Sequence, residues 1–120
     1  MGYLFEMHYH TGEVSPCGNV PAAEGIRAYG EKGYAGVVVT DHFFRDYFAS
    51  LSDSLSWPEK IDRYLGGYRL ARKAGEECGV RVLLGMELRF LHSSNDYLVY
   101  GMTEDLFKAT EAPYEWTEEV

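Results

Sequence analysis

The chain has 120 residues, of which 46% are hydrophobic and 15% are aromatic, and this is enough to build the core of one domain of ordinary size. The formal net charge is −8. Acidic residues are concentrated after Thr103, where Lys108 is the only cation. This composition excludes a disordered chain, and the charge argues against broad nucleic-acid binding, which needs clustered Lys and Arg.

The sequence has none of the usual signals for secretion, membrane insertion or nucleotide binding. Its first residues lack a basic start and a long apolar run, and no stretch approaches a membrane span. Phosphate-loop and dinucleotide fingerprints are absent. Cys17 and Cys78 form no C-x-x-C pair, so we expect cytosolic thiols rather than a disulfide. These features predict a cytoplasmic protein with no membrane partner.

The first half of the chain predicts a strand, a helix and a second strand. Tyr3–His10 is rich in aromatic and apolar residues, as strands are, and Val20–Lys32 has helical spacing. Ala35–Thr40 is a continuous apolar run, typical of a strand buried in a parallel sheet. We expect a long connection over Asp41–Leu55, of the kind that often forms a binding loop. Its aromatic side chains either line a substrate pocket or pack under the loop: Phe43, Phe44, Tyr47 and Phe48.

A long helix is predicted next. Ser56 and Glu59 have the spacing of a capping box, and Gly79 ends the helical pattern. Gly66 and Gly67 each weaken a helix by roughly 1 kcal/mol relative to alanine, so we expect close packing there to compensate.

The last part predicts two strands and a short helix. Val80–Leu84 and Tyr97–Tyr100 have strand composition, and about Thr103–Ala109 is helical, followed by an acidic tail. The order β-α-β-α-β-β-α predicts an α/β protein with a mainly parallel sheet, either open or the start of a barrel.

Polar residues follow three of the predicted strands. His8 and His10 end the first strand, Asp41 and His42 follow the second, and Glu87 follows the third. In parallel α/β proteins the carboxyl ends of the strands converge on the ligand site. Imidazole and carboxylate groups are ligands for zinc, manganese and iron. A lone His-x-His pair is more often structural, but its coincidence with two further strand ends predicts a divalent-metal site.

Three short motifs resemble those of the polymerase and histidinol phosphatase (PHP) family. Glu6–Thr11 (EMHYHT) resembles the first motif, usually D-x-H-x-H-T. Gly36–His42 (GVVVTDH) is similar to the second, an apolar strand ending in T-D-H, and Gly85–Glu87 (GME) to the third, G-x-E. The resemblance extends to about Gly101. It implies the N-terminal part of a distorted barrel of seven β/α units, with up to three divalent metals and hydrolysis of phosphoesters.

The resemblance also implies roles for individual residues. His8 and His10 would ligate one metal, His42 another, and Glu87 would bridge two. Asp41 would serve catalysis by orienting its neighbours rather than as a direct ligand.

Cationic side chains near these motifs suggest how substrate would be held. Arg89, just beyond Glu87, and Arg45, in the aromatic connection, are the candidates for neutralising the phosphate of a small phosphorylated substrate. Either is otherwise an ordinary surface arginine.

The chain departs from the family pattern in its first loop. Glu6 stands where Asp is usual, and the loop from Thr11 to Gly18 is two residues longer than usual. Cys17 or Glu13 would therefore occupy the place of a further ligand, and a thiolate would favour zinc.

The later motifs of the family have no counterpart, so the resemblance implies that residues 1–120 are the N-terminal portion of a PHP domain. We then expect little or no hydrolysis by this chain alone, and self-association through an open sheet edge or order supplied by a partner segment. The alternatives are a polymerase-associated PHP module, a metal-binding half-domain without activity, and an amidohydrolase-type barrel.

Overall fold

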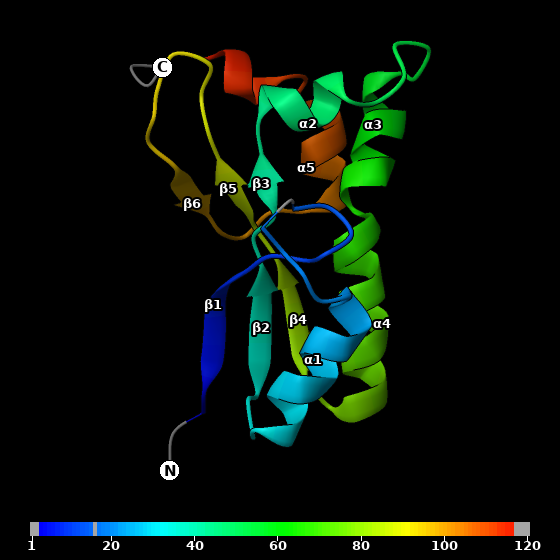
Figure 1. Cartoon of the computed structure of the whole chain (residues 1–120), viewed down its shortest axis with the longest axis vertical. Coiled ribbons are helices and arrows are strands. Elements are labelled where there is room, and N and C mark those ends of the chain that lie inside the picture. Colours follow the sequence, from blue (N-terminus) through cyan, green and yellow to red (C-terminus); the bar gives the residue numbers. More distant parts are fainter. Residues whose placement is uncertain (1–2, 16, 117–120) are drawn as a thin grey trace.

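The computed structural model describes residues 3–15 and 17–116. Within these ranges the chain is an α/β protein with two small sheets stacked end to end, β1, β2 and β4 below β3, β5 and β6 (Figure 1). The predicted α/β class with a parallel sheet is confirmed. None of the described helices is long and apolar enough to cross a membrane.

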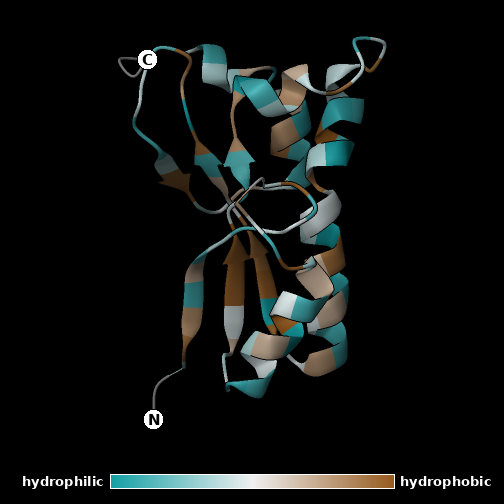
Figure 2. Cartoon of the chain, in the orientation of Figure 1, coloured by the Kyte–Doolittle hydropathy of each residue, from teal (hydrophilic) through white to brown (hydrophobic). Residues whose placement is uncertain are grey.

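The first sheet is parallel, in the order β1 (Phe5–Tyr9), β2 (Gly36–Val39), β4 (Arg81–Leu84). Because β2 is central, its continuous run of valines is buried throughout. Helices α1 (Ala22–Glu31) and α4 (Gly66–Cys78) pack on each other and share one core with the sheet. β2 and the end of β4 are correspondingly the most hydrophobic part of this sheet (Figure 2).

The second sheet continues two strands of the first. After Thr40 and Asp41, β2 gives way to β3 (His42–Phe43), and after Gly85, β4 gives way to β5 (Met86–Leu88). β3 pairs with β5 in parallel, and β5 pairs with β6 (Tyr97–Val99) in the antiparallel sense. A Cβ atom on Gly85 would lie 2.6 Å from the Val99 carbonyl oxygen, so this break requires glycine.

The helices beside the second sheet enclose an aromatic core. These helices are α2 (Arg45–Ala49), α3 (Trp57–Tyr64), α5 (Glu104–Ala109) and a 3₁₀ turn (Pro113–Glu115). The buried rings that pack there are Phe43, Phe48, Tyr64, Phe107 and Tyr114. Packing these rings fixes the orientation of β3, which carries His42.

Two sequence predictions for this region are wrong. Asp41–Leu55 is not one long connection, because it contains β3 and α2. Glu87 lies within β5 rather than after a strand. The acidic tail, to which the sequence assigns no structure, is partly folded, since Tyr114 is buried and its carbonyl oxygen accepts a hydrogen bond from the Leu91 N–H at 2.9 Å. Residues 117–120 of that tail lie outside the described residues.

One edge of the first sheet is formed by β1, whose apolar side chains Phe5 and Met7 are exposed, and the other by β4. The expected self-association through an open edge stays a prediction.

The long helix predicted from Ser56 is divided at Leu65 into α3 and α4. The capping box is confirmed, because the Glu59 N–H donates to Ser56 Oγ and the Ser56 N–H donates to Glu59 Oε1. The expected close packing is present at Gly67, where an added Cβ would lie 2.7 Å from the Cβ of Thr11. At Gly66, among the described residues outside its chain neighbours and its own helix backbone, no atom lies within 4 Å of an added Cβ.

These two glycines give a matched test of the packing. Gly67→Ala should lower the free energy of unfolding by about 1–3 kcal/mol, because the methyl group overlaps Thr11 in the loop that approaches the site. Gly66→Ala should leave it unchanged or raise it by up to about 1 kcal/mol through helix propensity. Urea denaturation of both variants measures the difference, and equal effects would contradict the close approach.

Candidate metal centre

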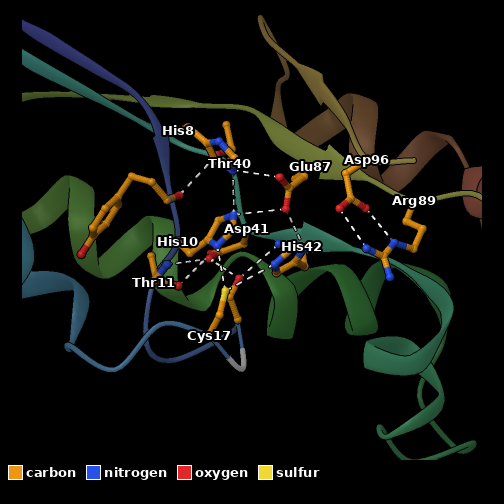
Figure 3. A network of polar contacts seen from close by, with 12 residues as sticks. His8, His10, Thr11, Cys17, Thr40, Asp41, His42, Glu87, Arg89 and Asp96 are labelled. Carbon is orange, nitrogen blue, oxygen red and sulfur yellow. Dashed lines mark hydrogen bonds and ion pairs between the residues drawn. The ribbon is translucent and has the colours of Figure 1, made fainter. Parts of the chain in front are cut away.

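The predicted ligands converge where the first sheet meets the second (Figure 3). His8 lies on β1 and His10 directly follows it, His42 lies on β3, and Glu87 lies beside His42 in the register of β5. Cys17 approaches from the loop after β1. The parallel order of the strands therefore brings residues far apart in the sequence to one point.

Glu87 is at the centre of this cluster, and its side chain is only 8% exposed. Its Oε1 lies 2.8 Å from His8 Nε2. Its Oε2 lies 2.7 Å from His42 Nδ1 and 3.3 Å from His10 Nε2. Three imidazoles thus surround one buried carboxylate.

The contacts around Glu87 Oε2 are short, but they are not hydrogen bonds. This atom is buried and has no hydrogen-bond partner in the described part of the chain. Burial, together with the imidazoles of His42 and His8, lowers the pKa of His10 from its usual value, and the neighbouring Glu87 carboxylate partly offsets this effect. Ring nitrogens and carboxylate oxygens that approach without hydrogen-bond geometry can direct their lone pairs at a shared cation.

The donor atoms form two overlapping groups. The carboxylate group consists of His8, His10 and Glu87, and the thiolate group consists of His10, Cys17 and His42. Within each group the donor atoms lie within 4.8 Å of one another. Metal–ligand bonds of about 2.0–2.3 Å place the donors of one tetrahedral ion roughly 3–4 Å apart. Both groups therefore fit a divalent ion.

The first loop offers two candidate ligands, Cys17 and Glu13, and their contacts differ. Cys17 Sγ lies 3.0 Å from His10 Nδ1 and 3.4 Å from His42 Nε2. Glu13, the other candidate, instead accepts the Ala22 N–H at 2.8 Å and so caps the first turn of α1. Glu6 accepts hydrogen bonds from the His8 N–H and the Tyr29 hydroxyl. Of the two alternatives in the loop, only Cys17 reaches the cluster.

Asp41 braces the loop and belongs to neither group. Its carboxylate accepts hydrogen bonds from the Thr11 N–H at 2.6 Å, the Thr11 hydroxyl at 2.7 Å and the Ser15 hydroxyl at 2.8 Å. Burial raises the pKa of Asp41 to about 6, and these hydrogen bonds partly offset the effect. Its backbone carbonyl oxygen accepts from the Tyr64 hydroxyl at 2.6 Å. Asp41 directly precedes His42, and its side chain holds the loop that carries Cys17. It is therefore a positioning residue that fixes this loop relative to β3.

Arg89 lies at the rim of the site. Its guanidinium donates to both carboxylate oxygens of Asp96, at 2.7 and 2.9 Å. Arg89 and Phe44 line a pocket of about 220 Å³ together with His42 and Cys17. Arg45 lies farther out, where it lines an adjoining pocket with Arg89 and Phe44.

Four aromatic residues are expected either to line a pocket or to pack under their loop. Of these, Phe44 lines the pocket beside Cys17, His42 and Arg89. Phe43 and Phe48 are buried in the core, and Tyr47 packs against Phe48 and Tyr64. For these three the packing alternative is the correct one.

Sequence reasoning missed two residues of the site. Ser15 Oγ accepts the His42 N–H at 3.1 Å while it donates to Asp41, and so couples the loop to β3. Asp96 holds Arg89 in place. Neither follows a strand or belongs to a motif, so no spacing signal distinguishes them from ordinary loop residues.

No protein-family model matches this chain, and no curated protein matches its sequence. Its chemistry must be inferred from its motifs and its geometry.

Replacing Asp41 tests its positioning role. Asp41→Ala should lower the free energy of unfolding by about 1–3 kcal/mol, because it leaves buried donors of Thr11 and Ser15 unpaired. Zinc affinity should fall about 10- to 100-fold, as it does when outer partners of metal ligands are removed. Denaturation and calorimetric titration measure the two effects. Asp53→Ala, in an exposed loop, is the control; unchanged stability and affinity in Asp41→Ala would contradict the role.

Proposed function

We propose that this chain carries the metal centre of a PHP-type, metal-dependent phosphoesterase. The observation that carries the proposal is the convergence of three imidazoles on the buried Glu87, whose Oε2 has no hydrogen bond among the described residues. Zinc, manganese and iron are the ions suited to such donors. A complete site of this class would hold two or three of them.

The fold supports this proposal. Parallel strands with helices on one face are the start expected of a distorted barrel of seven β/α units, and the ligands lie at the carboxyl end of the first sheet. On this proposal residues 1–120 are the N-terminal part of that domain.

The proposed hydrolysis assigns a part to the three histidines, Glu87, Asp41 and Arg89. Bound divalent ions would lower the pKa of a water molecule and polarise phosphoryl oxygens. Glu87 and the three histidines hold the ions, and Asp41 keeps the loop and β3 in register. Arg89 is placed to neutralise phosphate charge, and the phosphate would share its guanidinium with Asp96 or displace that carboxylate.

Two observations support a small phosphorylated molecule as the substrate: the size of the pocket and the net charge. The pocket beside His42 and Arg89, of about 220 Å³, suits a small phosphorylated molecule. The net charge of −8 disfavours a nucleic-acid backbone, and with it the polymerase-associated alternative.

A second candidate function is metal binding without turnover. The observation that favours it is the Arg89–Asp96 pair, because a guanidinium already neutralised by a carboxylate attracts phosphate less strongly. The two candidates predict the same metal affinity and differ only in hydrolysis.

The Glu87→Gln variant tests both the metal centre and the metal-dependent hydrolysis. Manganese affinity should fall by more than about tenfold, because a direct ligand is lost. Zinc affinity should fall about 10- to 100-fold even where Glu87 only orients the histidines that bind zinc. The parent chain should release p-nitrophenol from p-nitrophenyl phosphate slowly and only with added metal, and Glu87→Gln should not. Slow turnover is expected because the ligands come from only three strands and one loop.

Glu13→Gln is the matched control, since Glu13 caps α1 and lies outside both donor groups. It should keep the parent's affinity and rate. Metal binding by the parent without even one metal-dependent turnover per chain would contradict the phosphoesterase and leave the second candidate. Equal affinities in the parent and in Glu87→Gln would contradict the metal centre itself.

A further inference from the structure

The proposed hydrolysis does not explain why a thiol lies in the cluster. Cys17 Sγ approaches His10 Nδ1 at 3.0 Å and His42 Nε2 at 3.4 Å, and so faces two ring nitrogens at ligand spacing. Cys78, the other free cysteine, lies at the end of α4 and belongs to neither donor group. The unpaired Oε2 of Glu87 is a separate observation that also points to a cation at this cluster.

His10 is shared by the two donor groups, but through different atoms. Its Nδ1 faces Cys17, whereas its Nε2 lies 3.2 Å from His8 Nε2 and 3.3 Å from Glu87 Oε2. A neutral imidazole offers one lone pair and carries its proton on the other nitrogen. His10 can therefore serve the thiolate group or the carboxylate group, but not both at once.

The two groups differ in chemical softness. A thiolate with two imidazoles selects zinc and similar ions such as cobalt(II) and cadmium. A carboxylate with two imidazoles and open positions suits harder ions such as manganese. His10 would therefore bind zinc-class ions through Nδ1 and manganese-class ions through Nε2.

Glu87 has a role in either arrangement. With an ion on His42 Nε2, the proton of that ring sits on Nδ1, which is 2.7 Å from Glu87 Oε2. With the same ion on His10 Nδ1, the remaining proton of His10 faces the same oxygen at 3.3 Å. Glu87 then becomes the outer carboxylate that orients zinc-bound histidines, a common arrangement in zinc sites.

We propose that Cys17, His10 and His42 form a thiolate site for zinc-class ions, distinct from a manganese-class site on His8, His10 and Glu87. The inference rests on the metal centre of the proposed function and is independent of hydrolysis. Binding releases the thiol proton of Cys17 to solvent and forms a metal–sulfur bond, with no change of oxidation state.

Cobalt(II) substitution tests this directly, because a thiolate ligand gives an intense near-ultraviolet charge-transfer band. The parent chain and Cys78→Ser should show this band at one equivalent of cobalt, and Cys17→Ser should lack it. Cys17→Ser should also lose more than about tenfold in zinc affinity, while its manganese affinity, followed by electron paramagnetic resonance, stays at the parent value.

Cys17→Asp provides a second variant, because a carboxylate replaces the thiolate with a hard ligand. It should lack the cobalt band and still bind manganese, which shows that His8, His10 and Glu87 remain in place. A band that persists in Cys17→Ser, or cobalt bound to the parent without a band, would overturn the thiolate site. The band without phosphoester hydrolysis would sustain this inference and contradict only the enzymatic function. No binding of any metal would overturn both.

Discussion

The buried carboxylate of Glu87 is the constraint on which the arrangement of this protein depends. Burial of a carboxylate whose hydrogen-bonding capacity is not met is strongly unfavourable. In the described part of the chain Glu87 Oε2 has short contacts but no hydrogen bond. On the proposed function, a bound cation would remove this conflict by neutralising the carboxylate. The cluster would then be more stable with metal than without it.

The backbone delivers the ligands through a break shared by two neighbouring strands. β2 is fixed by its buried valines, and β4 by its pairing with β2 and by the buried Leu84. Each strand resumes after one or two residues as β3 or β5. Gly85 permits the break because the Val99 carbonyl oxygen leaves no space for a side chain. Asp41 ties the break to the Thr11 loop, so His42, Glu87 and Cys17 are positioned by one connected set of contacts.

The sequence predicts the parts of this structure that depend on continuous apolar runs or on residue chemistry. The valine run of β2 and the capping box at Ser56 are examples, and so is the convergence of His8, His10, His42 and Glu87. It does not predict β3 or α2, because two- and five-residue elements are too short to show a period. The division at Leu65, the burial of Tyr114 and the capping role of Glu13 arise from tertiary contacts that leave no local pattern. Which of Cys17 and Glu13 reaches the cluster is likewise decided by tertiary contacts, because Glu13 binds the first N–H of α1.

We propose that Glu87 and its histidines hold a divalent ion. Crystals of the chain grown with zinc and measured on both sides of the zinc absorption edge test this. We expect an anomalous peak about 2 Å from a nitrogen of His10 or His42, and within the cluster centred on Glu87. Histidine rings hydrogen-bonded to Glu87 with no anomalous peak among them, at saturating zinc, would contradict it.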